Sequence, residues 1–189
     1  MRSKDDQGAQ ARRLPQAVRA LDESATFGDV LESLVNHAGR EAGRAAIFLV
    51  KGERLHDWRT VGFDRASDAV RLDVPFSESG PMAEAVRSGQ GVHPRRERAV
   101  PDFANGEEPR EAGAWPVSVG GSVVAVLYAD GPVADKSDEP YWPAFLDVLA
   151  RHCGRVLEGI TVRQAAGLVA GKATGIASSV GRQSSGSIQ

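Results

Sequence analysis

The side chains best suited to chemistry in this sequence are one cysteine and four histidines. Cys153 lies in an apolar helical stripe, where a thiol more often packs as a small hydrophobic side chain than reacts. The histidines are scattered, without the i, i+4 pairing of a helical metal site, at positions His37, His56, His93 and His152. Serine, histidine and aspartate residues form no nucleophile-elbow pattern. We therefore predict no catalytic residues, no metal site and no cofactor, and expect that the protein is not an enzyme.

Three other patterns resemble sites for metals or phosphates, and each has a simpler interpretation. His93 stands beside a long loop, so metal or haem binding there is an alternative to a surface histidine. The stretch GLVAGKAT resembles a phosphate loop, but its glycine spacing is wrong and an alanine replaces the metal-binding hydroxyl. Arg95, Arg96 and Arg98 form a basic cluster, but the acidic residues around them favour a solvated loop over an anion site.

Aromatic side chains are the remaining candidates for a binding site, because several of them fall on expected strands or in the long loop. Their rings would line a pocket against the sheet, although ordinary core packing is an equal interpretation for each one. The residues that we predict to line such a pocket are Trp58, Phe63, Phe76, His93, Phe103, Trp115 and Tyr128.

The element that must position these side chains is a hairpin at residues 114–130, with the sequence AWPVSVGGSVVAVLYAD. The Gly-Gly pair at its centre suits a two-residue turn, which needs positive φ. With that turn, Trp115 would pair with Val126, and one face would carry both Trp115 and Tyr128. The outgoing strand is apolar on both faces, as is typical of a strand that is covered on both sides.

The rest of the chain predicts helices before and after a sheet, because its apolar residues recur first at helical, then at strand, then at helical spacing. Residues 94–112 hold mixed charge, proline and Asn-Gly, which predict a long loop. The other expected elements are helices from Leu14, from Thr26 and over 141–163, a short helix after Pro81, and strands at 45–50, 55–63 and 70–76.

Composition predicts one globular domain in a chain of 189 residues, of which 41% are hydrophobic and 25% charged. We expect a disordered segment at 1–13, the domain at 14–165 and a flexible Gly/Ala/Ser-rich tail at 166–189. A net charge of −2 argues against general attraction to nucleic acid or membrane. The N-terminus lacks the apolar run of a signal peptide, so we expect a cytoplasmic protein.

The ordered set of these elements resembles a GAF domain, over residues 14–165. The resemblance implies an α+β fold related to PAS domains, with a central antiparallel sheet of five to six strands. The N- and C-terminal helices would cover one face, and the short helix and long loop the other. The matching stretches are GRAAIFLVKGERL, the V-G-F at 61–63, VPFSESGPMAEAVRSGQGV, the P-D-F at 101–103, and PVSVGGSVVAVLYADGP with the terminal helix.

The chemistries of GAF relatives set further limits on function. Cyclic-nucleotide-binding relatives often carry an Asn-Lys pair, whereas here His37 follows Asn36 and Gly106 follows Asn105. Bilin-binding relatives attach the pigment through a pocket cysteine, but Cys153 lies in the apolar stripe of the last helix. Methionine-sulfoxide-reducing relatives need several cysteines, and this chain has one. The resemblance therefore implies a module without catalytic activity.

Two functions remain open at this stage. In the first, a sensory or regulatory module binds a small ligand between the sheet and residues 64–112, and signals in trans to a protein partner. In the second, the protein's own side chains fill the pocket, and the domain is a scaffold for dimerisation and protein–protein interaction. For both functions we expect a homodimer that is formed through the terminal helices. The residues predicted at that interface are Leu14, Val18, Leu21, Val156 and Ile160.

Overall fold

The computed structural model describes residues 4–63, 73–94, 102–104, 110–132 and 141–180 of the chain. The helices are α1 (Lys4–Asp22), α2 (Phe27–Ala42), α3 (Pro81–Ser88) and α4 (Trp142–Val180), with two 3-10 helices, η1 (Phe76–Glu78) and η2 (Asp102–Ala104). The strands are β1 (Arg44–Lys51), β2 (Arg54–Val61), β3 (Asp73–Pro75), β4 (Arg110–Val119) and β5 (Ser122–Pro132).

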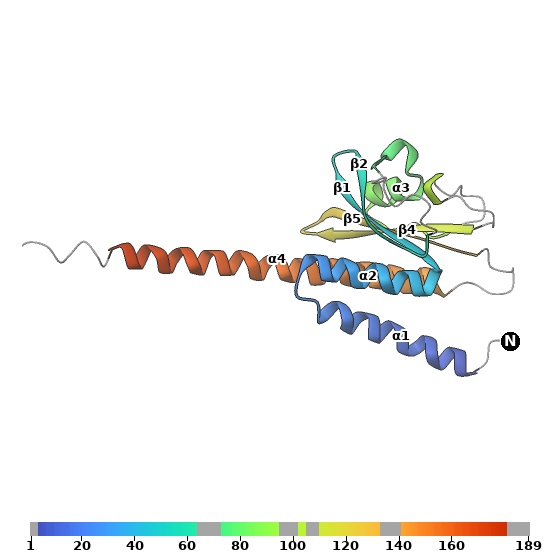
Figure 1. The fold of residues 1–189 in the computed structure, drawn as a ribbon, viewed down its shortest axis with the longest axis horizontal. Coiled ribbons are helices and arrows are strands. Elements are labelled where there is room, and N and C mark those ends of the chain that lie inside the picture. Colours follow the sequence, from blue (N-terminus) through green and yellow to red (C-terminus); the bar gives the residue numbers. More distant parts are fainter. Residues whose placement is uncertain (1–3, 64–72, 95–101, 105–109, 133–140, 181–189) are drawn as a thin grey trace, which may run out of the picture.

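The five strands form one antiparallel sheet in the order β3-β2-β1-β5-β4. Helices α2 and α4 pack against one face of this sheet, and α1 packs outside them (Figure 1). Helix α3 lies on the opposite face, where η2 also packs. The predicted α+β fold is therefore confirmed, with the terminal helices on one face and the short helix on the other. Of the predicted long loop, residues 95–101 and 105–109 lie outside the described residues.

Local sequence signals account for the start of α2. Thr26 Oγ1 accepts a hydrogen bond from the Asp29 amide at 3.2 Å, and Asp29 Oδ2 accepts one from the Thr26 amide at 3.1 Å. This capping box satisfies amide groups that have no partner within the helix. At the other end, Gly43 adopts a φ of 100°, which glycine tolerates without steric cost. The helix thus begins and ends where its residues predict.

The β4–β5 hairpin turns at the predicted Gly-Gly pair, but its register differs from the prediction. A β-bulge between Val117 and Ser118 shifts the pairing, so Trp115 opposes Leu127. Successive residues of a strand point to opposite faces, and a bulge that adds one residue exchanges those faces. Trp115 therefore lies on the helix-covered face and Tyr128 on the other. The prediction that one face carries both side chains is wrong for this reason.

Both terminal helices are longer than predicted. Helix α1 begins at Lys4, inside the segment predicted to be disordered, and α4 continues to Val180, inside the segment predicted as a flexible tail. Alanine favours helix in both stretches, and glutamine and arginine add to this preference in the N-terminal one. Figure 1 shows α4 leaving the domain as a single helix. Within the described ranges, no helix has the length and apolarity needed to cross a membrane.

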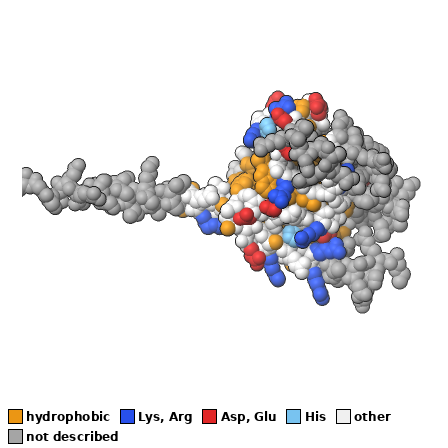
Figure 2. Space-filling view, in the orientation of Figure 1, with side chains coloured by type: hydrophobic (Ala, Val, Ile, Leu, Met, Phe, Trp, Pro, Cys, Tyr) orange, Lys and Arg blue, Asp and Glu red, His pale blue; other side chains and the backbone are white. Residues whose placement is uncertain are grey.

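The outer surface of the helical layer is mostly polar on the side seen in Figure 2. Charged side chains are scattered there over α1 and α2, whereas hydrophobic side chains gather over the sheet. Ion pairs join neighbouring elements in this region: Arg13 pairs with Glu41 at 3.3 Å and Arg59 with Glu32 at 2.9 Å. Such exposed pairs add little stability, so burial of the helix stripes must hold this layer together.

Helix α4 approaches β4 closely at Gly154. A Cβ atom on this glycine would stand 2.5 Å from the backbone oxygen of Ser118, a distance that real Cβ atoms do not show. The atom in the way belongs to the backbone of a paired strand, so it cannot move aside without disturbing the sheet. A side chain at this position would therefore push α4 away from the sheet.

We expect Gly154→Ala to destabilise the fold by about 1–3 kcal/mol, because the added methyl group forces α4 from β4. Gly159→Ala is the matched control, since its Cβ would meet only the flexible end of Arg163 at 3.3 Å. The control should be neutral or stabilise by up to about 1 kcal/mol through helix propensity. Urea unfolding followed by circular dichroism measures both. Equal stability of the two variants would contradict the close packing of α4 on β4.

Candidate functional site

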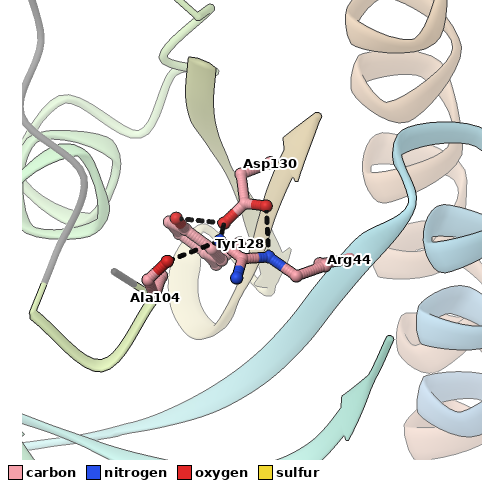
Figure 3. Close-up of polar contacts among 4 residues, drawn as sticks. All are labelled: Arg44, Ala104, Tyr128 and Asp130. Carbon is pink, nitrogen blue, oxygen red and sulfur yellow. Dashed lines mark hydrogen bonds and ion pairs between the residues drawn. The ribbon is translucent and has the colours of Figure 1, made fainter. Parts of the chain in front are cut away.

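The face of the sheet opposite α2 and α4 carries a buried ion pair between its two central strands. Arg44 of β1 and Asp130 of β5 are directly paired in the ladder. Arg44 Nε lies 2.6 Å from Asp130 Oδ1, and Nη2 lies 2.7 Å from Oδ2, so the contact is bidentate (Figure 3). The side chains are 12% and 0% exposed. Charged hydrogen bonds with this geometry are strong, and removal of one partner would leave a buried charge without compensation.

The same ion pair binds two further groups. The Tyr128 hydroxyl donates a hydrogen bond to Asp130 Oδ2 at 2.7 Å. Arg44 Nη2 donates to the backbone oxygen of Ala104, the last residue of η2 (Figure 3). The guanidinium of Arg44 also lies over the ring of Phe63, with its carbon 4.8 Å from the ring centroid. One arginine thus connects both central strands to a 3-10 helix from the far loop.

An aromatic cluster lies beside this ion pair and consists of Phe48, Phe63, Phe103 and Tyr128. The Phe103 ring, from η2, is its centre: its centroid lies 5.2 Å from that of Phe48, 5.2 Å from that of Tyr128 and 6.3 Å from that of Phe63. These tilted and edge-on contacts add to the energy of burial. Phe103 therefore fills the space between the strands and the ion pair, and η2 is held there by one ring and one carbonyl.

The seven residues predicted to line a pocket are divided between the two faces of the sheet. Trp58 and Trp115 pack with the core beneath the helices. His93 is exposed and meets the Trp115 ring edge-on, with centroids 6.1 Å apart. A ligand-binding role for any of the seven stays a prediction. Those on the side of η2 are Phe63, Phe76, Phe103 and Tyr128.

Three residues of this site were not predicted from the sequence: Phe48, Arg44 and Asp130. Phe48 belongs to an apolar run that predicts only a buried strand. A charged residue at each of two strand ends is a weak signal, since such residues commonly face solvent. The available clue was the two-residue spacing of Tyr128 and Asp130, which places both side chains on one face of β5. Only the pairing of β1 with β5 brings Arg44 to them.

The cysteine and one of the histidines have pKa values that are shifted by their surroundings. Burial raises the pKa of the Cys153 thiol to about 12, so the thiolate is scarce at neutral pH. Burial, and then the charge of Arg40, lowers the pKa of His37. Within the described ranges, no three histidine, cysteine or acidic side chains are grouped as a metal site would need.

The five residues predicted at a dimer interface lie on α1 and α4, which pack against each other. Leu21 and Ile160 are 0% and 3% exposed, within the core of a single chain. Leu14, Val18 and Val156 are partly buried against the same core. The helices therefore use much of this apolar stripe within one chain, and a role of these residues between chains stays a prediction.

We expect Cys153 to be unreactive in the folded protein. With a pKa of about 12, only about one thiol in 10⁴ is ionised near pH 8, and the sulfur is fully buried. Reaction with an aromatic disulfide reagent should be at least about 100-fold slower in buffer than in urea, where the chain is unfolded. The single cysteine makes the readout unambiguous. Equal rates in the two solvents would contradict its burial.

No protein-family model matches the sequence, and no curated protein matches it. Solved structures match the fold. The GAF domain of a phosphoenolpyruvate-protein phosphotransferase from Acinetobacter has a TM-score of 0.59 and 18% identity, over 82% of this chain and 95% of that one. A methyl-accepting chemotaxis protein segment gives 0.62 and 14%, over 79% and 99%. The free methionine-R-sulfoxide reductase of Neisseria meningitidis gives 0.62 and 20%, over 87% and 96%.

These structures share the layered arrangement described above, at identities that establish fold rather than activity. The chain reproduces nearly the whole length of each matched domain. Its antiparallel sheet, with terminal helices on one face and a short helix on the other, is the arrangement that the sequence resemblance implied. This chain has the GAF fold.

Proposed function

We propose that this chain is a non-catalytic regulatory GAF module that binds a small ligand beneath η2 and signals in trans through its terminal helices. The observation that carries the proposal is the buried Arg44–Asp130 ion pair, which holds η2 through the single carbonyl of Ala104. A polar group placed inside an otherwise apolar face is typical of a site that orients a ligand. Our proposal places the site within the region predicted from the sequence.

The contacts of η2 suggest the chemistry of the ligand. Phe103 contributes a flat ring to the aromatic cluster, and Ala104 contributes a hydrogen-bond acceptor to Arg44 Nη2. A ligand that replaces both would carry a planar ring with an acceptor, preferably an anionic oxygen, at its edge. Such a ligand would compete with Phe103 for the same space. Its binding would therefore move η2 from the position in which Phe103 fills the cluster to a second position. The extent of this shift depends on the difference between the ligand's affinities for the two positions.

The absence of catalysis is part of the proposal and rests on the chemistry of the residues near the site. Cys153 is on the opposite face of the sheet and is held as a thiol by its raised pKa. The carboxylate of Asp130 is engaged by Arg44 and by the Tyr128 hydroxyl, which suits a structural role better than proton transfer. One solved structure with this fold is a reductase, so turnover of free methionine sulfoxide is the activity to exclude.

The proposed output is helix α4. It packs on β4, α2 and α1, and it continues to Val180 beyond the domain (Figure 1). Val148 and Val162 on this helix are 47% and 64% exposed. Exposed apolar side chains along a projecting helix suit a second helix as partner, which favours a homodimer. A cytoplasmic location stays a prediction from the sequence.

A second candidate function is the scaffold, in which the same pocket binds no ligand. The specific observation in its favour is that Phe103 already fills the space between Phe48, Phe63 and Tyr128. In this alternative η2 is a permanent part of the core, and the module acts only through dimerisation and protein contact. The two candidates differ in what happens when Phe103 is removed.

For the sensory function, we expect Phe103→Ala to bind benzoate at least about tenfold more tightly than the unsubstituted chain, because the ligand no longer displaces a ring. Phe76→Ala is the matched control, since Phe76 packs on the same face outside the four-ring cluster. Titration followed by NMR chemical shifts measures both constants. A folded Phe103→Ala variant without any benzoate response would favour the scaffold. Benzamide, which lacks the charge, should bind more weakly.

For the homodimer, we expect light scattering to give twice the chain mass at micromolar concentration. Val148→Glu combined with Val162→Glu should convert this species to a monomer, because charges would enter the proposed helix pair at its two exposed valines. Gln164→Glu is the control, since residue 164 lies on the other side of α4 from residues 148 and 162 and is exposed. A monomeric unsubstituted chain, or a dimer unaffected by the double change, would remove this part of the proposal.

A further inference from the structure

Helix α4 carries a second stripe of residues on the side opposite the core. Its buried side chains, among them Leu149, Cys153 and Leu157, pack with the sheet and the other helices. On the opposite side, Val148 is 47% exposed and Val162 is 64% exposed. Residues three and four apart lie on one side of a helix, so the residues between and beside these valines form a line. This line, the outer stripe, consists of Val148, His152, Arg155, Gly159, Val162 and Ala166.

The sequence continues the outer stripe to the end of α4. The same steps of three and four residues lead to Val169, Ala173, Ile176 and Val180. From Gly159 on, two kinds of residue alternate: glycine or alanine at positions 159, 166 and 173, and valine or isoleucine at 162, 169 and 176. This heptad repeat is typical of a helix that pairs with another helix. The distance from residue 148 to residue 180 along the helix is about 48 Å.

The alternation of small and branched residues favours an antiparallel pair of these helices. In a parallel pair each layer holds the same residue twice, so alanine would face alanine and leave a gap. In an antiparallel pair with two-fold symmetry, a small residue can face a branched one in every layer. One register does this: Val162 faces the partner's Ala166, and Gly159 faces the partner's Val169. The sizes of the facing residues are then complementary along the stripe.

The charges along the stripe favour the same direction. A parallel pair would bring Arg155 against the partner's Arg155, and like charges in contact are destabilising. In the antiparallel register Arg155 faces the partner's Ala173, whose small size accommodates the long stem of the arginine. Glu158, beside the stripe, faces the partner's Lys172, and symmetry makes this ion pair twice. Glu158 also accepts the Gly120 amide at 2.9 Å, which a carboxylate can combine with a second partner.

We propose that α4 pairs with α4 of a second copy in antiparallel orientation, along the outer stripe and its continuation to Val180. This inference rests on the homodimer proposed above and adds the direction and register of the helix pair. The two domains would lie at opposite ends of the pair, and each projecting segment would cover the exposed Val148 of the other chain. Each domain is thereby in contact with the helix that leaves the other one, which gives signalling in trans a direct route.

The first test uses two full-length variants, Gly159→Cys and Val169→Cys. A Cβ atom on Gly159 would meet only the flexible end of Arg163, at 3.3 Å, so a side chain fits there. In the antiparallel register the two positions face each other, whereas each lies about 15 Å along the axis from its own copy, too far for a disulfide. We expect oxidation to link the variants only when they are mixed, with one of them isotope-labelled so that mass identifies the pair. The unsubstituted chain, with its buried Cys153, should stay unlinked.

The outcomes of this test separate the direction of the helix pair from the homodimer itself. If Val169→Cys links to its own copy as readily as to Gly159→Cys, the pair is parallel and the inference is overturned. A dimer by light scattering in which the mixed variants form no disulfide also overturns the inference but leaves the homodimer in place. A monomeric unsubstituted chain removes the homodimer and this inference together.

The second test exchanges the charges beside the stripe. Glu158→Lys should raise the Kd of the dimer at least about threefold, because it places a lysine against the partner's Lys172 twice. Adding Lys172→Glu should restore the Kd. Adding Arg163→Glu instead is the matched control and should not restore it, since Arg163 would face position 158 only in a parallel pair. All these variants lose the hydrogen bond to Gly120 alike. Sedimentation equilibrium measures the constants, and a Kd that Lys172→Glu leaves raised would contradict the proposed register.

Discussion

Arg44 and Asp130 face each other across strands β1 and β5, with the aspartate fully buried and the arginine largely so. Two ions in this setting are stable only when their geometry satisfies both, and the bidentate contact with the Tyr128 hydroxyl provides that. Because the arginine also binds the carbonyl of Ala104, the far loop is attached to the centre of the sheet. The position of η2, and with it the filling of the aromatic cluster, depends on this contact.

The two faces of the sheet differ in how they are filled. Beneath α2 and α4 the core is closed by apolar stripes, with Trp115 against Trp142 and the thiol of Cys153 among them. On the face of η2 the apolar cluster surrounds an ion pair and is closed by one phenylalanine ring. The first face resists change because its packing is continuous along whole helices. Among the described residues, the second is covered by two short elements, α3 and η2, rather than by long helices.

Helix α4 connects these parts. It touches β4 so closely at Gly154 that no side chain fits there. It then extends past the domain (Figure 1). A movement of β4 would therefore be transmitted to α4 rather than absorbed between them, because the contact is made by backbone atoms.

The sequence by itself determined the order and type of most elements. Helical spacing, the Thr26 capping signal and the Gly-Gly turn are local properties, so residues close in the chain were enough to predict α2 and the hairpin. The arrangement of the layers came instead from the resemblance of the ordered elements to a GAF domain. The bulge between Val117 and Ser118 was not predictable in this way, because no local residue signal marks it; it lies where Gly154 of α4 approaches the backbone of Ser118. This one-residue shift in register places Trp115 and Tyr128 on opposite faces of the sheet.

The site itself was decided by tertiary structure. Phe103 and Tyr128 were named from their aromatic character, but the ion pair that organises them joins residues 86 positions apart. Arg44 and Asp130 at separate strand ends look like ordinary solvent-facing charges until β1 pairs with β5. Composition and residue spacing describe each strand and helix separately, whereas the ion pair between Arg44 and Asp130 forms between two strands.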